Sequence, residues 1–302
     1  MLDYHRTLLE DEMRVTALRQ AVARTVQPGD VVVDLGCGTG ILAFFACEAG
    51  ARRVFALERE HMADVAAFLA RHLQLADRVT VLHQPSTAIE LPERADVLLT
   101  ETIGAAGLDE NILGLVLDAR KRLLRENARI VPRRLALIAA PADVPEPYER
   151  HVAFWGRAQS GLDFSPLRVF ASNAMLLLKI GDEAHVAAPA VLADVDFAAA
   201  TSTLVRGAAE STTTRDATVH GFALWFRATL ADEIVLTNQN GRARSWAQAF
   251  LPLDTPLPVT RGTPVALAIE TDDGKVWRWR GRIGETEFDQ TTILNRPPCT
   301  QR

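Results

Sequence analysis

The sequence predicts a parallel α/β half followed by an all-β half, with the boundary near Pro132. In the first half, apolar runs of strand length alternate with segments of helical length, which is typical of a parallel sheet covered on both faces. In the second half, short alternating strands are separated by turn sequences such as PADVPEP, NQNG and DDG. The 302 residues, 48% of them apolar, suffice for two modest domains, which we place at 1–132 and 133–302.

The first half opens with apolar residues at helical spacing over 8–26, which predict an amphipathic helix ended by QPGD. VVVDL then predicts a buried strand that runs into the turn GCGTG, and ILAFFACE predicts a helix ended by Gly50. The remaining elements expected in this half are strands at 52–58, 78–83 and 95–101 and helices at 61–75 and 108–124.

The second half has the period-2 pattern of β-strands. The segment at 151–170 departs from it, because HVAFWGRAQSGLDFSPLRVF has a partly helical pattern and indicates an excursion from the sheet. The tail at 295–302 is expected to be a loose end. Strands are expected at 135–140, 174–180, 217–230, 233–237, 247–253, 264–270 and 275–283.

Composition excludes several classes of protein. The net charge of −5 is spread along the chain without a long basic run, so nothing indicates binding to nucleic acid. No apolar window reaches the ~18 residues of a membrane span, and the acidic N-terminal stretch is not a secretory signal. Three cysteines (Cys37, Cys47, Cys299) offer neither a disulfide framework nor a zinc pattern, which favours the reducing cytoplasm.

The turn GCGTG has the features of a ligand site. Gly36, Gly38 and Gly40 lack the β-carbons that would keep a ligand from the backbone. Glu58 ends the next strand, where a carboxylate can accept both hydroxyls of a ribose. The spacing differs from GxGxxG, which makes a dinucleotide the weaker interpretation, and a tight turn without a ligand is the structural alternative.

The decapeptide ETIGAAGLDE places Glu101 and Glu110 nine residues apart around small or apolar residues. An arginine guanidinium is planar, permanently charged and offers a rigid fork of donors, so two carboxylates could grip it and fix its plane. Glu101 follows a central strand, at the edge where ligands of open α/β sheets bind. The structural alternative is that Glu101 only ends a strand and Glu110 only begins a helix, where an acid is favoured.

The stretch DLGCGTGILAFFACEAGARRVFALE resembles motif I of class I S-adenosylmethionine-dependent methyltransferases, and the chain as a whole resembles the protein arginine methyltransferases. ETIGAAGLDE stands where that family has its loop of two glutamates. The resemblance implies a Rossmann-like domain followed by a β-barrel domain, with a dimerisation arm inserted at about 151–172. It also implies a homodimer and S-adenosyl-L-methionine as cofactor. Because the sulfonium methyl is already activated, no metal is expected.

The resemblance assigns roles to individual residues. Glu101 and Glu110 would act in catalysis, and Trp246 would line the substrate pocket, although a tryptophan of the barrel core is the structural alternative. Arg14 matches the arginine that pairs with the cofactor carboxylate. The residues implied in cofactor binding are His5, Arg14, Asp34, Gly36, Cys37, Gly38, Thr39, Gly40, Glu58, Ser86 and Thr87.

The sequence also departs from the family. Its aromatic N-terminal helix has no counterpart, with only Tyr4 near, and Thr102 and Ala105 replace aromatic residues of the glutamate loop. The family's Thr-His-Trp loop is replaced by Arg244-Ser245-Trp246, so Ser245 stands in place of the histidine. In the family this histidine pairs with an aspartate, and Asp11 matches that aspartate. Leu8 and Ile112 stand where the family has methionines.

Three functions therefore remain open. The first is methylation of a guanidinium in a peptide or protein. The second is N-methylation of a small-molecule amine or guanidine on the same scaffold, favoured by the more open site. The third is a non-catalytic cofactor-binding module, against which the retained GCGTG, Glu58, Glu101 and Glu110 argue. We expect no partner among nucleic acids or membranes.

Overall fold

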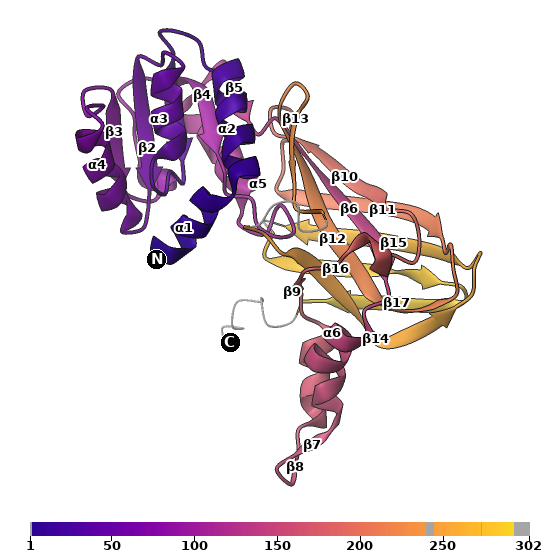
Figure 1. The fold of residues 1–302 in the computed structure, drawn as a ribbon. Helices are drawn as coiled ribbons and strands as arrows, with labels where there is room; N and C mark the ends of the chain where they lie inside the picture. Colours follow the sequence, from indigo (N-terminus) through magenta and orange to yellow (C-terminus); the bar gives the residue numbers. More distant parts are fainter. Residues whose placement is uncertain (1, 240–244, 273, 293–302) are drawn as a thin grey trace, which may run out of the picture.

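The computed structural model describes residues 2–239, 245–272 and 274–292. An α/β layer structure comes first in the chain and a barrel domain second, and an arm inserted in the barrel sequence at 145–172 projects from it (Figure 1). No helix in these ranges is long and apolar enough to cross a membrane. Arg244, Cys299 and the tail lie outside the described residues.

A parallel sheet of five strands in the order β3-β2-β1-β4-β5 forms the first half. Its central strand is buried along its whole length, which explains why four of its five residues are apolar and Asp34 is the exception. The bounds are β1 (Val31–Leu35), β2 (Arg53–Glu58), β3 (Val79–His83), β4 (Ala95–Thr100) and β5 (Leu124–Val131). Leu35 lies in register with Leu57 and with Thr100, so β1, β2 and β4 end at the same edge.

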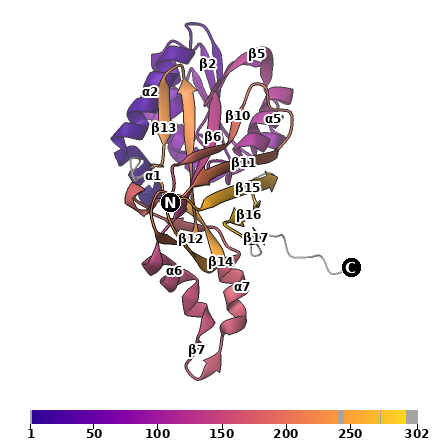
Figure 2. The ribbon, with the colours of Figure 1, turned by 90° about the vertical axis from the view of Figure 1, so that its right-hand side faces the viewer.

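Helices cover both faces of this sheet, with α2 on one face and α5 on the other (Figure 2). α3 packs against α2. The bounds are α2 (Glu12–Thr25), α3 (Ile41–Glu48), α4 (Met62–His72) and α5 (Ile112–Arg122). α5 begins four residues later than expected, because Asn111 adopts a left-handed conformation with φ 62°.

The single helix expected over 8–26 is two helices, α1 (Leu2–Glu10) and α2. They divide at Asp11, whose side chain accepts a hydrogen bond from the Arg14 amide (3.2 Å) and thereby caps α2. None of the residues of α1 is buried. The helical region thus begins at Leu2 rather than near Leu8, and Tyr4 lies in its first helix.

The barrel domain contains two antiparallel sheets, with strand orders β10-β6-β12-β14-β9 and β11-β15-β16-β17; β13 pairs with β12. Trp277 and Trp279 of β16 and Phe226 of β12 are fully buried in its core. The bounds are β6 (Arg134–Ala142), β9 (Leu176–Leu178), β10 (Ala190–Asp196), β11 (Leu204–Thr212), β12 (Ala217–Ala231), β13 (Ile234–Thr237), β14 (Gln248–Val259), β15 (Pro264–Asp272), β16 (Val276–Ile283) and β17 (Thr286–Thr291). β5, β10, β11 and β17 are additional to the strands expected from the sequence.

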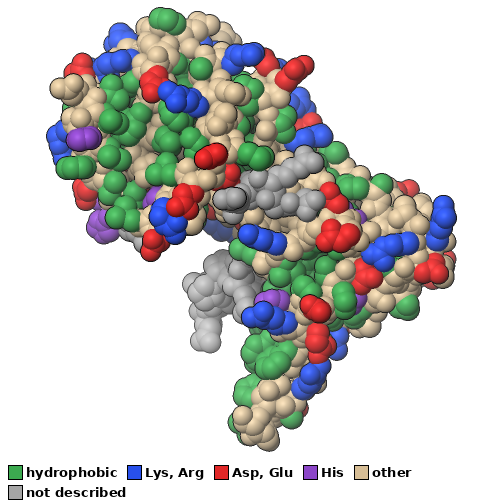
Figure 3. Space-filling view, viewed as in Figure 1, with side chains coloured by type: hydrophobic (Ala, Val, Ile, Leu, Met, Phe, Trp, Pro, Cys, Tyr) green, Lys and Arg blue, Asp and Glu red, His purple; other side chains and the backbone are tan. Residues whose placement is uncertain are grey.

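The arm leaves the barrel as α6 (Pro145–His151), turns at β7 (Ala158–Gln159) and β8 (Leu162–Asp163), and returns as α7 (Arg168–Ser172) (Figure 1). Hydrogen bonds tie both ends to the barrel: the Tyr148 hydroxyl donates to the Leu253 carbonyl (2.9 Å), and the Gln290 amide donates to the Ser172 carbonyl (2.6 Å). Apolar side chains show on the surface of the arm (Figure 3). This matches the partly helical excursion expected from the sequence.

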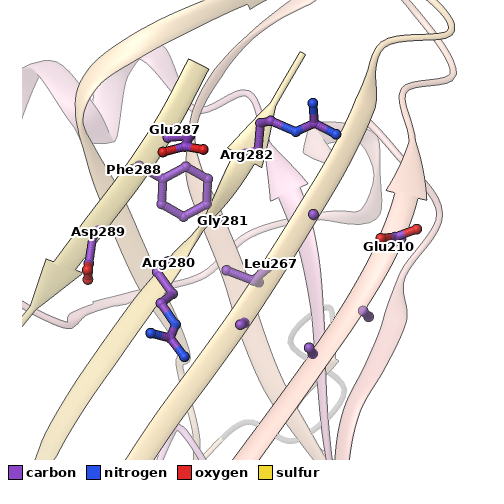
Figure 4. A pocket seen from close by; sticks show the side chains of 12 residues that line it. Glu210, Leu267, Arg280, Gly281, Arg282, Glu287, Phe288 and Asp289 are labelled. Atoms are coloured by element: carbon purple, nitrogen blue, oxygen red, sulfur yellow. The ribbon is translucent and has the colours of Figure 1, made fainter. Parts of the chain in front are cut away.

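A hollow of about 820 Å³ lies over β11, β15, β16 and β17 (Figure 4). Arg280, Arg282 and Glu210 stand around it, above a floor that includes Leu267 and Gly281. None of the site residues expected from the sequence lines this hollow.

Candidate active site

The glycine turn follows β1 directly and lies between two other segments. A β-carbon on Gly36 (φ +74°) would be 2.8 Å from Thr102 Cγ2 of the glutamate loop. A β-carbon on Gly38 (φ +53°) would be 2.9 Å from His5 Cε1 of α1. The backbone conformation favours glycine at both positions, and at Gly36 the lack of space beside Thr102 does so as well. The turn, the glutamate loop and α1 meet at one place.

Glu58 lies at the end of β2, beside the turn. Its Oε2 accepts a hydrogen bond from the Gly38 amide (2.9 Å), and its Oε1 accepts one from the Glu60 amide (2.9 Å). These two amides fix the orientation of the carboxylate. Each oxygen has a further lone pair, so Glu58 can also accept from the hydroxyls of a ribose.

Asp34, the last but one residue of β1, is fully buried. Its Oδ2 accepts a hydrogen bond from the Ala43 amide (2.9 Å), while its Oδ1 is buried without a partner. Burial raises the pKa of this carboxyl to about 7. Cys37 is also buried, and burial raises the pKa of its thiol, so this thiol packs in its neutral form. Thr39 is half-buried in the same turn.

α1 lies over the turn. His5 is half-buried against Gly38, and its pKa is lowered chiefly by burial, while Glu58 acts in the opposite direction. Tyr4 is 58% exposed, and partial burial, followed by the charge of Glu110, raises its pKa. Tyr4 therefore lies near the second glutamate of the loop.

Residues 101–110 fold into a compact loop between β4 and α5. The Gly107 amide donates to the Gly104 carbonyl (2.9 Å), and Asp109 Oδ1 accepts from the Ala106 amide (2.8 Å). The residues from Ile103 to Leu108 are buried. This turn is so tight that a β-carbon on Gly104 would be 2.4 Å from the Asp109 carboxylate.

The two glutamates occupy different environments. The Glu101 side chain is 9% exposed, pairs with Arg14 and accepts a hydrogen bond from the Ile103 amide (3.4 Å). Glu110 is exposed at the other end of the loop. Loss of water on the side facing the protein, followed by the neighbouring Asp109 carboxylate, raises the pKa of Glu110, and Arg59 opposes this shift. Only Glu110 presents its carboxylate openly to solvent.

Arg14 is held on three sides. Its Nη1 donates to the Leu8 carbonyl (3.1 Å), its Nη2 donates to Glu101, and its Cζ lies 5.4 Å from the centre of the Trp246 ring. Its Nε is buried without a partner, and burial lowers the pKa of the guanidinium to about 10. The unpaired donor fits an arginine that has a further acceptor to meet, such as a carboxylate of a bound cofactor.

The segment 245–246 joins the barrel to this site. The Trp246 indole donates to the Ile103 carbonyl (2.8 Å) and packs edge-to-face on Phe226 (5.3 Å), so it supports the glutamate loop and is also part of the core. Ser245 donates to Asp11 Oδ2 through its amide (2.9 Å) and its hydroxyl (2.8 Å). The structure thus places Asp11 beside the residue at the position of the missing histidine.

Ser86 and Thr87 belong to η1 (Ser86–Ala88), which follows β3. Because His83 is in register with Glu58, this segment emerges at the same edge of the sheet as the glycine turn. Arg122 donates to the Ser86 carbonyl (2.8 Å), while the Thr87 side chain is exposed.

Sequence reasoning missed Asn238. This residue is fully buried, and its amide donates to the Ala105 carbonyl (2.9 Å) and to the Ala247 carbonyl (2.7 Å). Its Oδ1 accepts from the Phe226 amide (3.0 Å). In the sequence it begins NQNG, which indicates only a turn, so no local signal distinguishes it.

Comparisons with known proteins agree with this geometry. A family described as the arginine methyltransferase oligomerization subdomain matches residues 136–284, and one described as ribosomal protein L11 methyltransferase matches residues 13–130. Protein arginine N-methyltransferase 6 of Danio rerio is 31% identical over 278 residues, which cover 86% of this chain and 79% of that protein. A probable protein arginine N-methyltransferase 6 of Arabidopsis thaliana is 33% identical over 74% of this chain, which spans about half (53%) of that protein.

Solved structures show the same fold. One is titled as the Trypanosoma brucei PRMT1 enzyme-prozyme heterotetrameric complex with AdoHcy; it has a TM-score of 0.83 at 23% identity, with 95% of this chain and 96% of that chain covered. Arabidopsis thaliana protein arginine methyltransferase 10 has a TM-score of 0.82 at 21% identity, with 96% and 97% covered. With a matching oligomerization subdomain, a relative above 30% identity and the glycine turn beside two glutamates, this chain belongs to the protein arginine N-methyltransferase family.

Proposed function

We propose that this protein is an S-adenosylmethionine-dependent enzyme that methylates a guanidinium nitrogen of arginine in a peptide or protein. The observation that supports this most directly is the contact between the two halves of the site. Gly36 of the cofactor turn and Thr102 of the glutamate loop pack against each other, so a ligand on the turn lies next to an acceptor on the loop. Positioning of this kind is the main source of rate when the electrophile is already activated.

The residues around the turn fit the cofactor. Glu58 would accept from the ribose hydroxyls, Gly36 and Gly38 would let the backbone approach, and the unpaired Nε of Arg14 suits the carboxylate. Asp34 Oδ1 is a second buried atom without a partner on this side. His5, Cys37, Thr39, Gly40, Ser86 and Thr87 would complete the walls. When bound, S-adenosyl-L-methionine supplies the activated methyl group.

The acceptor would lie between Glu101 and Glu110. A carboxylate on each side orients the guanidinium plane and concentrates its charge away from the attacking nitrogen. That nitrogen would form a bond to the methyl carbon as the sulfur–carbon bond of the sulfonium breaks, which leaves a thioether, and the nitrogen would then lose one proton. Ser245 cannot titrate near neutrality, so we expect the proton to leave to water rather than to a histidine.

We extend the proposal to assembly and location. The arm has the exposed apolar side chains of a docking element, including Leu162 (64%) and Val169 (49%), and would join two copies in a homodimer. The buried free thiols of Cys37 and Cys47 suit the reducing cytoplasm. We take residues 1–132 and 133–302 as the two domains.

The test is transfer of a labelled methyl group by purified protein. We expect label on peptides that carry arginine between glycines, and little label on free guanidines or amines of similar charge. Glu110→Gln should lower the transfer rate at least 100-fold, of the order found when one electrostatic group is removed from an active site. The variant should still bind S-adenosylhomocysteine.

Glu126→Gln is the matched control, because it makes the same charge change at an exposed position in β5. It should leave transfer unchanged. If small amines were labelled in preference to peptides, the substrate would be a small molecule rather than a protein. Failure to bind either form of the cofactor would remove the proposal altogether.

A further inference from the structure

Arg14 belongs to both parts of the active site. Its side chain and that of Glu101 are buried together, at 7% and 9% exposure, and form an ion pair. The same guanidinium lies against Trp246 and donates to the Leu8 carbonyl, which leaves only Nε without a partner. A single arginine thus pairs with the first glutamate of the acceptor site and keeps one buried donor for a further acceptor.

This ion pair weakens Glu101 as a ligand for a second cation. The charge of Glu101 is already balanced by Arg14, and its other oxygen accepts from the Ile103 amide. An arriving guanidinium would have to share a carboxylate with a buried arginine, and two like charges in one buried site repel strongly. Glu110 is exposed and would have to hold the acceptor largely alone.

A carboxylate that reaches the unpaired Nε of Arg14 changes this balance. It would meet the unpaired Nε and draw the guanidinium toward itself, because charge-assisted bonds to arginine form best in pairs from its rigid fork. Glu101 would then regain an uncompensated negative charge. Trp246 could support the guanidinium in both arrangements, since the face of an indole ring attracts the cation whichever N–H groups are hydrogen-bonded elsewhere.

We infer that Arg14 exchanges between Glu101 and the carboxylate of the cofactor, so that binding of the cofactor prepares the acceptor site. The exchange makes cofactor and acceptor bind cooperatively. By linkage, the acceptor must tighten the cofactor by the same factor. The inference rests on the proposed function and adds a coupling between the two ligands and the residue that carries it.

The test is calorimetric titration with a glycine-flanked arginine peptide. It is done on the protein alone, with saturating S-adenosylhomocysteine, and with saturating 5′-methylthioadenosine, which keeps the nucleoside but lacks the amino-acid carboxylate. We expect S-adenosylhomocysteine to tighten the peptide at least about fivefold, the lower end of the range for coupled sites. Methylthioadenosine should leave the affinity for the peptide unchanged.

Two variants identify the residue. In Arg14→Gln, Glu101 has no cation to release, so the affinity for the peptide should be the same with and without S-adenosylhomocysteine. Arg14→Lys keeps the charge and should retain part of the cooperativity. The comparison of the two nucleosides on the unmodified protein needs no variant, so the test stands even if Arg14→Gln fails to fold.

The outcomes separate the inference from the function on which it rests. Equal affinity for the peptide in all three titrations would overturn the exchange and leave the methyltransferase proposal intact. Equal tightening by both nucleosides would also overturn it, because the carboxylate would not be the cause. No binding of the peptide under any condition, with normal binding of S-adenosylhomocysteine, would instead contradict the acceptor site itself.

Discussion

Thr102 lies directly against Gly36: a β-carbon added to the glycine would stand 2.8 Å from Thr102 Cγ2. The first residue of the cofactor turn and the second residue of the glutamate loop thus limit each other's size. Thr102 also places its hydroxyl 3.2 Å from that of Thr100, whose Oγ1 donates to the Leu35 carbonyl (3.0 Å). The spacing between cofactor and acceptor is therefore fixed by neighbouring strand ends.

Gly36→Ala should weaken binding of S-adenosylhomocysteine at least tenfold, or about 1.4 kcal/mol. The added methyl collides with Thr102, so the turn has to move away from the ligand. Titration calorimetry measures the affinity. The control is Gly29→Ala, which has a similar positive φ (+92°) but open space around it, and it should not affect the ligand.

The collision can be relieved from the other side. Thr102→Ser removes Cγ2 and keeps the hydroxyl, so the double variant Gly36→Ala with Thr102→Ser should recover part of the lost affinity. If the double variant binds no better than Gly36→Ala, backbone strain rather than the contact limits binding.

Because residue 245 is a serine, the profile of transfer rate against pH should lack the ionisation that a histidine at this position would contribute. Activity should fall as the pH decreases through the pKa of Glu110, which lies above the ordinary 4.5, because the acceptor is held by the ionised carboxylate. Ser245→His would place an imidazole beside Asp11, whose carboxylate favours the charged ring. We expect that variant to gain a second ionisation in its profile of kcat/KM against pH. Coincident profiles would show that position 245 does not communicate with the reaction.

Asp34 should make the folded protein less stable as the pH rises. Its pKa is about 7 when folded, against an ordinary 3.8, so between these values the folded chain holds a proton that the unfolded chain has lost. The free energy of unfolding then falls with pH by at most about 1.4 kcal/mol per unit from this group. Asp34→Asn keeps an acceptor for the Ala43 amide and removes the charge.

Urea unfolding of Asp34→Asn and the unmodified protein at pH 5, 6, 7 and 8, without added cofactor, measures this effect. The variant should gain stability over the unmodified protein as the pH increases. Asp64→Asn, at an exposed position of α4, is the control and should follow the unmodified protein. A constant difference for Asp34→Asn across the range would mean that Asp34 is ionised throughout.

Assembly should depend on the tip and returning helix of the arm. Leu162→Glu and Val169→Glu place charges on exposed apolar positions there and should convert the dimer to a monomer in sedimentation velocity runs. Val235→Glu changes an equally exposed valine (44%) on β13, outside the arm, and should remain dimeric. If Val235→Glu dissociated the dimer and the two arm variants did not, the dimer interface would lie on the barrel instead of the arm.

The sequence predicted the elements whose burial is uniform. β1, β2 and β4 are mostly apolar because helices cover both faces, and each was expected close to its place. β5 was missed because residues 125–127 near its start are exposed, and β11 because its inward positions include small residues such as Gly207. The alternation of apolar and polar residues that predicts a strand is hard to recognise where few large side chains enter the core.

The site follows the same logic. Gly36, Glu58 and Glu101 could be expected at one edge, because adjacent parallel strands end there. The pairing of Arg14 with Glu101 joins positions 87 residues apart and depends on how α2 packs, which no local pattern records. The same holds for Asp11, which resembles an ordinary helix cap but also binds Ser245 across 234 residues.

Asn238 connects the two halves of the chain by hydrogen bonds, so the conformation of the glutamate loop depends on the barrel. Its one amide closes the backbone of the glutamate loop at Ala105 and that of the barrel at Phe226 and Ala247. Residues 1–132 produced alone would present bare carbonyls at Ile103 and Ala105, and the loop would lose the support that shapes it. The barrel thus holds the glutamate loop in its conformation through Asn238 and Trp246. A hybrid protein that takes its barrel from a relative would need an equivalent asparagine and tryptophan in that barrel.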